Sequence, residues 1–455
     1  MTELQGRHFH VVGIGGSGMS ALATILLDSG AIVSGSDLKD SNVLDRLRAR
    51  GATISIGHSE EAVEGADVVA YSSAISDRNV EIVGARSRGL ALWTRADLLV
   101  ALTEAKRVIA VAGTHGKTTT TSMLSLALTS SGLDPSYVVG GELNEAGSSA
   151  RAGEGGFFVV EADESDGTFL RLSPEVAIVT NVEQDHLDYF GDVASLKEAF
   201  RRFGLSAQGG TVVCFDDQGA RETFDGEEVL SYGLNDDARF RIRNLALAPH
   251  LTSFELFDGR QRLGQVDLPI PGIHNVRNAT AALVAGLTVG APVEQMALSL
   301  SRFVGVQRRF QYKRRIGEIT VIDDYAHLPS EIRATLQAAR QVTSGRVVVV
   351  FQPHRFSRTA QLAVELGQAL EGADCIVVAN VYGAGEEPIP GVSGALVADA
   401  ARVLRGQAVT YVEHRSELAD VVVALLRPGD LVLSMGAGDI TLLDQELFEQ
   451  LGPDR

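Results

Sequence analysis

The sequence predicts an α/β protein of three domains, each built around a mainly parallel β-sheet. The chain has 455 residues, too many for one ordinary core, and roughly 100 to 200 residues per domain gives about three domains. Short apolar β-runs alternate with helical patterns in three successive series, which is the rhythm of parallel sheets. In the middle series, alternating runs such as "TSFELF" follow the other strands and predict an antiparallel extension.

The first series covers residues 1–103. It opens with a strand, a helix and a second strand in "HFHVVGIGG", "MSALATILLDSG" and "AIVSGSD", and "VLDRLRARG" and "ADVVAYSSAI" repeat the pattern. The amphipathic segment "TRADLLVALTEAKR" predicts a connecting helix. We therefore place the first domain boundary near residue 104.

The second series covers residues 104–309 and the third covers 310–455. In the second, strands are expected at "VIAVA", "FFVVEAD", "VAIVTNVE" and "TVVCFDD", and a helix entered through a polar cap at "GIHNVRNATAALVAG". The third has strands at "ITVIDD", "RVVVVFQ", "CIVVAN" and "DLVLSMGAG". Apolar runs of this length bounded by polar turns are typical of buried parallel strands.

Composition narrows the class of protein. The formal net charge of −18 argues against nucleic acid or an anionic membrane as a partner, because both demand a basic face. No apolar run approaches the ~18 residues of a membrane span, and "MTELQGRHFHVVGIGG" lacks the pattern of a secretory signal. Cys214 and Cys375 are too few for a disulfide framework or a cysteine zinc site. We therefore expect a cytoplasmic protein.

The stretch "VIAVAGTHGKTTTTSM" predicts a phosphate-binding loop between a strand and a helix. Gly113 and Gly116 let backbone N–H groups approach phosphate oxygens, and the helix N-terminus adds a favourable dipole. Lys117 can reach terminal phosphates, and the Thr118 hydroxyl can ligate Mg²⁺. The standard spacing would need a glycine at Val111, so the loop departs from it. A plain turn with a solvated lysine is the alternative, and G-K-T-T in this context argues against it.

The stretch "GIGGSG", residues 13–18, follows the first strand and opens the first helix, and Asp37 ends the second strand. The spacing G-x-G-x-x-G predicts close approach of backbone to a pyrophosphate. It does not distinguish NAD from another diphosphate, and a glycine turn that only packs helix against strand also fits. The sequence therefore predicts a pyrophosphate site without choosing its ligand.

Acidic side chains follow two apolar strands of the second series. "VVEADESDGT" places Glu161 at the end of one strand, and "VTNVEQDHLDYF" places His186 just after another. The carboxyl ends of strands are where α/β sheets place functional groups, and Mg²⁺ prefers oxygen ligands. We therefore predict Glu161 as a ligand of Mg²⁺ and His186 as a ligand of a second ion, with surface acids and a satisfied histidine as the alternative.

Later motifs carry groups that suit a nucleotide and a carboxylate: "GIHNVRNATAA", "QRRF", "DDYAHLPSE" and "FQPHRFSRT". An aspartate at a strand end can hold ribose hydroxyls, and an arginine between domains can reach phosphate. Two arginines in a short loop suit an anionic carboxylate. A simple salt bridge is the alternative for any one of them. The candidates are Asn275, Arg309, Asp324, Tyr325, His354, Arg355 and Arg358.

In this order and spacing, the motifs resemble those of the Mur ligases, the ATP-dependent amide-forming enzymes of peptidoglycan precursor assembly. The shared motifs are "GTHGKTTT", "EADESD", "TNVEQDH", "GIHNVRNATAA", "RRF", "DDYAH" and "FQPHRFSRT", which span nearly the whole chain. The family's loop, G-[TS]-x-G-K-[ST], also accounts for Val111. One departure is Leu328, which stands in "DDYAHLP" where the family usually has a second histidine.

The resemblance implies an architecture and a reaction. A Rossmann-like N-terminal domain (1–103) would hold the UDP part of a substrate, a central P-loop-type ATPase domain (104–309) would bind ATP and Mg²⁺, and a Rossmann-like C-terminal domain (310–455) would bring an amino acid. The reaction implied is ligation of L-alanine to the carboxylate of UDP-N-acetylmuramate through an acyl phosphate, by a monomer or homodimer.

The resemblance also implies a role for each candidate residue. ATP would contact Gly113, Thr114, His115, Gly116, Lys117, Thr118, Thr119, Asn275, Arg309 and Asp324. Metal ions would be held by Thr118, Glu161 and His186, and catalysis would rest on Lys117, Glu161 and His186. The UDP substrate would contact Gly13, Gly15, Gly16, Ser17, Gly18, Asp37, Ser72 and Ser73. Alanine would meet Tyr325, His354, Arg355 and Arg358.

Three alternatives remain open from the residues alone. A nicotinamide-dependent dehydrogenase would use "GIGGSG" and Asp37 but leaves the phosphate loop and the acids without a role. A nucleotide switch would use the phosphate loop only. Within the same superfamily stand a murein-tripeptide recycling ligase and a folylpolyglutamate synthetase, and the latter should lack a UDP-binding N-terminal domain.

Overall fold

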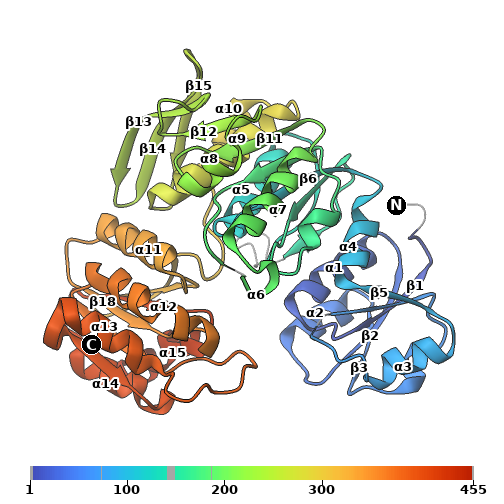
Figure 1. Ribbon diagram of the computed structural model, residues 1–455. Coiled ribbons are helices and arrows are strands. Elements are labelled where there is room, and N and C mark those ends of the chain that lie inside the picture. Colours follow the sequence, from blue (N-terminus) through green and yellow to red (C-terminus); the bar gives the residue numbers. More distant parts are fainter. Residues whose placement is uncertain (1–3, 73, 141–148, 186, 453–455) are drawn as a thin grey trace. The chain divides into compact units, whose positions relative to one another are not determined.

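Three β-sheets organise the computed structural model, which describes residues 4–72, 74–140, 149–185 and 187–452 (Figure 1). Their strand orders are β3-β2-β1-β4-β5, β15-β14-β13-β12-β11-β10-β6-β9-β7-β8 and β16-β17-β21-β18-β19-β20. The predicted α/β class, with one sheet for each series of the sequence, is confirmed. Two compact units divide the chain: Met1–Arg243, Glu255–Val266 and Arg277–Phe303 form one, and Asn244–Phe254, Asp267–Val276 and Val304–Arg455 form the other.

The N-terminal sheet is parallel throughout. Its strands are β1 (His8–Val12), β2 (Ile32–Asp37), β3 (Thr53–Ile56), β4 (Val68–Tyr71) and β5 (Ala91–Thr94). The helices between them are α1 (Ser17–Asp28), α2 (Asn42–Ala49), α3 (Val80–Ser87) and α4 (Arg95–Thr103), with a short 3₁₀ helix η1 (Glu60–Val63).

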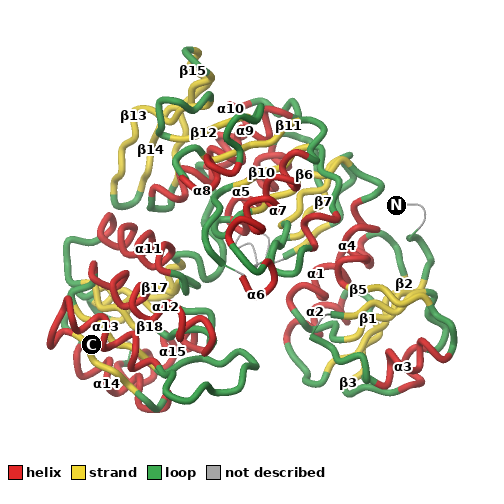
Figure 2. Tube along the Cα trace, viewed as in Figure 1, coloured by secondary structure: helices red, strands yellow, loops and turns green. Residues whose placement is uncertain are grey.

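Helices cover both faces of this sheet because successive strand side chains point to opposite faces. Phe9 and Val11 pack with buried leucines of α1, α2 and α4, whereas Val12 packs on the other side with Val63 of η1 and Ala85 of α3. Figure 2 shows the strands of this sheet between their helices. The first series is therefore a doubly wound unit.

The central sheet is mixed. Its strands are β6 (Arg107–Ala112), β7 (Ser136–Val138), β8 (Ala150–Arg151), β9 (Phe157–Glu161), β10 (Val176–Val179), β11 (Gly210–Cys214), β12 (Leu230–Gly233), β13 (Phe240–Ala248), β14 (Leu251–Asp258) and β15 (Gln261–Leu268). The strands from β6 to β13 pair with their neighbours in parallel, except that β7 and β8 form an antiparallel pair. Two residues join β13 to β14 and two join β14 to β15, a connection that only antiparallel neighbours allow. The predicted antiparallel extension is therefore present.

The helices of the central series are α5 (Lys117–Ser130), α6 (Leu187–Phe190), α7 (Val193–Leu205), α8 (Gln218–Thr223), α9 (Ile273–Thr288) and α10 (Val293–Leu300), with a 3₁₀ turn η2 (Thr168–Arg171). Strand β6 lies between β9 and β10 and is parallel to both. The segments after these three strands therefore leave the sheet at one edge. They carry the predicted phosphate loop and both predicted groups of acids.

The C-terminal sheet is parallel apart from the hairpin of β16 and β17. Its strands are β16 (Gln311–Ile316), β17 (Ile319–Asp324), β18 (Val347–Phe351), β19 (Cys375–Ala379), β20 (Val409–Val412) and β21 (Leu431–Met435). The helices are α11 (Pro329–Val342), α12 (Phe356–Ala369), α13 (Gly394–Arg405), α14 (Leu418–Leu425) and α15 (Leu443–Leu451), with 3₁₀ turns η3 (Leu370–Gly372), η4 (Gly406–Ala408), η5 (Arg415–Glu417) and η6 (Asp439–Leu442). Val349 packs in one apolar core and Val350 in a second, so this sheet is also covered on both faces.

Among the helices of the described ranges, none is long and apolar enough to cross a membrane.

Candidate active site

The phosphate loop, defined here as residues 113–116, joins β6 to the N-terminus of α5. Gly113 has φ +138° and Gly116 has φ +79°, conformations that side chains rarely adopt. A Cβ atom on Gly113 would lie 2.0 Å from the Thr180 hydroxyl oxygen, and one on Gly116 would lie 2.5 Å from the side-chain oxygen of Asn278. Both positions therefore require glycine. Because glycine is also the N-cap, no side chain there competes for the first N–H groups of α5, which suits an anion.

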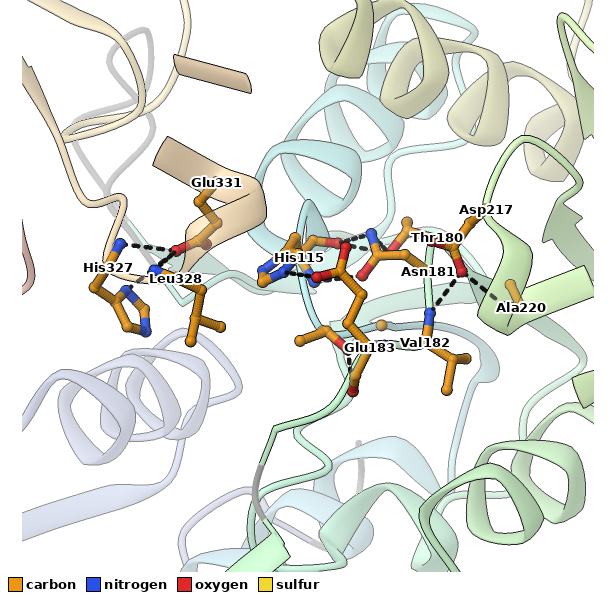
Figure 3. Close-up of polar contacts among 12 residues, drawn as sticks. His115, Thr180, Asn181, Val182, Glu183, Asp217, Ala220, His327, Leu328 and Glu331 are labelled. Carbon is orange, nitrogen blue, oxygen red and sulfur yellow. Dashed lines mark hydrogen bonds and ion pairs between the residues drawn. The ribbon is translucent and has the colours of Figure 1, made fainter. Parts of the chain in front are cut away.

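Two residues after β10 fasten the backbone of His115 (Figure 3). The His115 N–H donates to the Asn181 side-chain oxygen at 2.7 Å, and the Asn181 amide nitrogen donates to the His115 carbonyl at 2.9 Å. The Thr180 hydroxyl donates to the same carbonyl at 2.6 Å. The peptide N–H of His115, predicted to meet ATP, is thus used within the protein, and the loop's shape is fixed before a nucleotide arrives.

The neighbouring Thr114 is fastened in the same way. The Glu183 N–H donates to the Thr114 hydroxyl at 2.9 Å, and the Thr114 N–H donates to the Asn181 carbonyl at 3.3 Å. The ring of His115 lies 3.3 Å from a Glu183 carboxylate oxygen (Figure 3). We call Asn181, Thr180 and Glu183 the loop clamp. The sequence showed these polar residues but not that two of them hold loop backbone.

Lys117 is folded back over the loop. Its ammonium donates to the Gly113 carbonyl at 2.6 Å, to the Thr114 carbonyl at 3.3 Å and to a Glu164 carboxylate oxygen at 2.8 Å. Burial alone pulls the pKa of Lys117 down, but the charges of Glu164 and its acidic neighbours outweigh burial and raise that pKa above its ordinary value. Lys117 therefore stays protonated, as a phosphate-binding lysine must.

The two predicted metal ligands that the structure describes lie side by side. The Thr118 hydroxyl donates to one Glu161 oxygen at 3.0 Å, and the Gly140 N–H donates to the other at 2.6 Å. A hydroxyl and a carboxylate are the oxygen donors that Mg²⁺ takes, with water and phosphate oxygens completing its shell. The third predicted ligand, His186, lies outside the described residues. Within the described residues, no group of three His, Cys, Asp or Glu side chains is placed to hold a metal ion.

The N-terminal glycine loop sits at the first β-α connection. Gly13 has φ +74°, and the Gly15 N–H donates to a carboxylate oxygen of Asp37 at 2.9 Å. A Cβ atom on Gly15 would lie 2.8 Å from that oxygen, so Asp37 is packed beneath the loop. Asp37 therefore shapes the loop, a role that the predicted contact with substrate did not include. Gly16 is the N-cap of the 12-residue helix α1, whose first residue is Ser17.

The strand order adds a reason to expect a ligand here. β1 lies between β2 and β4, and open α/β sheets bind ligands beyond the carboxyl ends of strands where the order reverses. Ser72 follows β4 at this point, and its hydroxyl accepts from the Ala74 N–H at 3.3 Å. Gly18 lies in the first turn of α1, where a Cβ would meet Arg95 at 2.7 Å. Ser73 lies outside the described residues.

In the C-terminal sheet, Asp324 ends β17 and is 6% exposed. Its two oxygens accept from the backbone N–H groups of Phe310 and Ala326, both at 2.7 Å. Burial raises the pKa of Asp324 to about 6, although the nearby charge of Arg309 and these hydrogen bonds oppose the rise. Both carboxylate oxygens that were predicted to meet the nucleotide thus have partners within the protein.

The next residue, Tyr325, lies against two guanidinium groups. The Cζ atoms of Arg308 and Arg309 are 4.9 and 5.2 Å from its ring centroid. Arg309 also lies 3.6 Å from a Glu331 oxygen. The other oxygen of Glu331 accepts from the His327 N–H at 2.9 Å and the Leu328 N–H at 3.2 Å (Figure 3). Leu328, which stands where the family usually has a second histidine, is a buried residue at the start of α11.

The predicted alanine residues gather with two rings that the prediction omitted. Ring centroids of Tyr325 and His327 are 5.4 Å apart, those of His327 and His354 are 5.6 Å apart, and those of His354 and Tyr382 are 6.2 Å apart. His354 lies just before α12 and Arg358 lies in its first turn, and the Arg358 guanidinium bonds to the His354 Nδ1 at 3.1 Å. Burial lowers the pKa of His354 to about 4, helped by His327 and the arginines, so its ring is neutral at pH 7 and accepts from Arg358.

Arg355 precedes α12 with a left-handed φ of +67°, and its N–H donates to the Tyr382 carbonyl at 2.8 Å. Arg358 lies in the first turn of α12, so the two arginines that were predicted to share a short loop lie instead at the start of a helix. Backbone strain of this kind is a feature that functional sites retain. Asn275, in the first turn of α9, is buried and donates to the Pro271 carbonyl at 2.7 Å. The structure thus assembles Tyr325, His354 and Arg358, whereas the side chain of Asn275 is used to hold its own helix start.

Three family models match the chain in succession. "Mur ligase family, catalytic domain" matches residues 8–107, "Mur ligase middle domain" matches 111–286, and "Mur ligase, glutamate ligase domain" matches 308–438.

Curated relatives and solved structures are similar to the chain over nearly its whole length. The chain is 48% identical over 450 residues to UDP-N-acetylmuramate--L-alanine ligase of Pelotomaculum thermopropionicum, covering 98% of each chain. It is 44% identical over 458 residues to the enzyme of the same name from Desulforamulus reducens, covering 99% of each. Its fold resembles the crystal structure of UDP-N-acetylmuramate-alanine ligase from Thermotoga maritima, with a TM-score of 0.82, 31% identity and coverage of 97% and 98%. A murein peptide ligase of Psychrobacter arcticus, at 24% identity and TM-score 0.70, shares the fold.

Proposed function

Because the chain belongs to the Mur ligase family, we propose that it joins L-alanine to the carboxylate of UDP-N-acetylmuramate at the expense of ATP. The products are UDP-N-acetylmuramoyl-L-alanine, ADP and phosphate, and the reaction belongs to peptidoglycan precursor synthesis. The structural observation that carries this proposal is the phosphate loop, with Lys117 beside it and Thr118 bonded to Glu161. That arrangement suits transfer of a phosphoryl group, which activation of a carboxylate needs.

Each domain takes one task in this proposal. Residues 1–103 bind the UDP part of the substrate, 104–309 bind ATP, and 310–455 bring the amino acid. The glycine loop at the start of α1 and the one at the start of α5 support the first two assignments, because both present helix N-terminal N–H groups to an anion. The cluster of Tyr325, His354 and Arg358 supports the third.

The chemistry needs the carboxylate oxygen turned into a leaving group. An oxygen of the muramoyl carboxylate attacks the γ-phosphorus of ATP, the bond from phosphorus to the ADP oxygen breaks, and an acyl phosphate forms. The neutral amine of alanine then attacks the acyl carbon, a C–N bond forms, phosphate leaves and the amine loses a proton. Lys117 stabilises the charge on the transferred phosphoryl group, and the N–H groups of α5 hold the phosphates.

Mg²⁺ is proposed as the metal ion of this site, with Thr118 and Glu161 as ligands and His186 as the ligand of a second ion. When bound, Mg²⁺ supplies positive charge that the phosphate oxygens need during transfer. The contact of Glu161 with the Gly140 N–H orients its carboxylate toward Thr118. The contribution of the chain is therefore a prearranged pair of oxygen donors beside the loop.

For the amino acid, Arg355 and Arg358 suit the alanine carboxylate, with Tyr325 and His354 beside it. A guanidinium binds a carboxylate through two parallel charge-assisted hydrogen bonds. The neutral ring of His354 accepts a hydrogen bond from Arg358 through its Nδ1, which orients the guanidinium group. Asn275, Arg309 and Asp324 remain proposed nucleotide contacts, and a monomer or homodimer without nucleic-acid or membrane partners remains the prediction, as does the cytoplasmic location.

A phosphate-release assay with ATP, Mg²⁺ and UDP-N-acetylmuramate tests the proposal. Phosphate should appear when L-alanine is added and not with NAD or without an amino acid. A murein-tripeptide recycling ligase is the second candidate, because the fold of a murein peptide ligase is similar. It would release phosphate with L-alanyl-γ-D-glutamyl-diaminopimelate in place of alanine, and that result would overturn the first proposal. The dehydrogenase alternative is wrong, because the residues it relied on lie within 8–107, which match a Mur ligase family model.

A further inference from the structure

All three N–H groups of the Lys117 ammonium have acceptors in this structure. They are the Gly113 carbonyl, the Thr114 carbonyl and a Glu164 oxygen, at 2.6, 3.3 and 2.8 Å. An ammonium group has three donors and no more. A phosphate oxygen can therefore bond to Lys117 only after one of these three partners has been given up.

Glu164 is the carboxylate among these partners, and its neighbours in "EADESD" have other roles. Glu161 bonds to Thr118 and Gly140. Asp163 accepts from the Ser165 N–H at 3.0 Å, and Asp166 accepts from the Thr168 N–H at 2.9 Å. These two acids stabilise the turn that carries Glu164, so the turn is built to present one carboxylate to Lys117.

The pair is isolated from water. The side chains of Lys117 and Glu164 are 15% and 2% exposed. The second oxygen of Glu164 is buried and has no hydrogen-bond partner within the described residues. An ion pair in such surroundings is screened little by solvent, and it acts strongly on where the lysine lies. Burial raises the pKa of Glu164, and the charge of Lys117 opposes that rise. Paired with Lys117, Glu164 is an anion beside the loop where the phosphates of ATP are proposed to bind.

We infer that Glu164 is a positioning residue which holds Lys117 over the phosphate loop before ATP binds, and that ATP binds by exchanging this carboxylate for phosphate oxygens. The inference rests on the proposed function, because it takes Lys117 as a ligand of ATP. Glu164 thereby lowers the affinity for ATP. In return it keeps the ammonium charged and ordered until ATP binds.

Glu164→Gln tests the inference because glutamine keeps the size and the acceptor but removes the charge. Titration calorimetry with the β,γ-imido analogue of ATP and Mg²⁺ should show a Kd lower by about tenfold, the effect of one charge-assisted hydrogen bond. The KM for ATP should fall likewise while kcat changes less than about threefold, because Lys117 has left Glu164 by the time of transfer. An unchanged or higher Kd in a variant that melts at the wild-type temperature overturns the inference.

A double-mutant cycle shows whether the effect acts through Lys117. In the Lys117→Met background, Glu164→Gln should leave the Kd of the analogue unchanged within about twofold. The matched control is Asp166→Asn, which removes one negative charge from the same turn and keeps the acceptor for Thr168; its Kd should equal that of the wild type. A tenfold effect that persists without Lys117, or that Asp166→Asn reproduces, shows simple charge repulsion and overturns the positioning role.

Glu164→Asp covers the case in which the glutamine variant does not fold. Aspartate keeps the charge but withdraws the carboxylate by one methylene, so the Kd should fall below the wild-type value, by about two- to fivefold, and a Kd that is unchanged or higher overturns the inference. Calorimetry with the nucleotide alone does not depend on which amino acid the enzyme ligates. If the double-mutant cycle gives the expected Kd values but alanine releases no phosphate, the proposed reaction is rejected and the role of Glu164 stands. If alanine releases phosphate but the Kd values do not change as expected, only the role of Glu164 is rejected.

Discussion

At the scale of single residues, Lys117 carries the sharpest expectation for catalysis. Lys117→Ala should lower kcat by at least about a hundredfold, or about 3 kcal/mol, because the ammonium stabilises charge that develops during phosphoryl transfer. Binding of UDP-N-acetylmuramate should be unaffected, since that ligand is assigned to another domain. Phosphate release and calorimetry measure the two quantities. Turnover near the wild-type rate would remove Lys117 from the mechanism.

Asp324 carries an expectation for pH. Burial raises its pKa from an ordinary 3.8 to about 6, a change that corresponds to about 3 kcal/mol. Between these values the folded state binds the proton and the unfolded state does not, so the free energy of unfolding falls as pH rises through this window. Asp324→Asn should lack this fall.

Urea unfolding at pH 4, 5, 6 and 7 measures this effect as the difference between the wild type and Asp324→Asn. Other titrating groups are common to both proteins and cancel in that difference. The variant should gain about 2 kcal/mol relative to the wild type between pH 4 and pH 7, since part of the full change already occurs below pH 4. A difference that is constant with pH would mean that the pKa of Asp324 is ordinary.

Single residues also show where sequence reasoning stops. Residue types that suit phosphate and a metal ion could be recognised in "GTHGKT" and "EADESD" because their chemistry is local. Which of four neighbouring acids meets Lys117 depends on the turn after β9, so Glu164 was not distinguished from Asp163 or Asp166. Likewise Asp324 was predicted to hold a ribose, but its two nearest donors are backbone groups that tertiary structure brings to it.

At the scale of elements, the strands named in the sequence analysis are present, and several short ones were missed. β3, β5, β7 and β20 have only three or four residues, and β3 is largely exposed. A strand this short has too few side chains to show an alternation of period two. Pairing with a longer neighbour makes such segments strands, and that pairing is not encoded locally.

The loop clamp leads to a prediction at this scale. Asn181→Ala removes two hydrogen bonds to the backbone of His115, each worth about 1 kcal/mol, so the KM for ATP should rise about 10- to 30-fold as the loop loses its fixed shape. The KM for alanine should change less than about twofold. Steady-state kinetics with each substrate varied in turn gives both numbers.

Asn181→Asp is the informative companion to the alanine variant. It keeps the acceptor for the His115 N–H but loses the donor to the His115 carbonyl, and it adds a charge near the phosphates. Its KM for ATP should rise at least as much as in Asn181→Ala. An unaltered KM for ATP in both variants would show that the loop holds its shape without the clamp.

At the scale of the whole molecule, three sheets of similar design are each proposed to host a different ligand site. The fold class could be predicted from the alternation of strands and helices along the sequence. Three family models match three successive parts of the chain, in the same order as the three sheets. In a parallel sheet the loops that follow the strands all lie at one edge, and this holds for sheets that bind different ligands. The sheet alone therefore does not determine which ligand each domain binds. The assignment of ligands to domains therefore rests on the loop residues and needs its own test.

Gly16→Asp and Arg358→Ala provide that test. Gly16 is the N-cap of α1 with φ −63°, and a Cβ there would meet nothing nearer than the Gly13 carbonyl at 3.4 Å, so the variant should fold. The aspartate would cap α1 and occupy the N–H groups meant for the diphosphate. Binding of UDP-N-acetylmuramate should weaken at least about tenfold while ATP binding is unchanged, and Gly16→Asn, which caps without charge, should weaken it less.

Arg358→Ala should give the opposite pattern. Loss of a charge-assisted contact to the alanine carboxylate costs about 1.5 to 3 kcal/mol, so the KM for alanine should rise about 10- to 150-fold. The Kd values for both nucleotides should stay within about twofold of wild type, because neither touches this residue in the proposed assignment. If Arg358→Ala instead weakened binding of the ATP analogue, the arginines at the start of α12 would belong to the nucleotide site, and the amino acid would need another site.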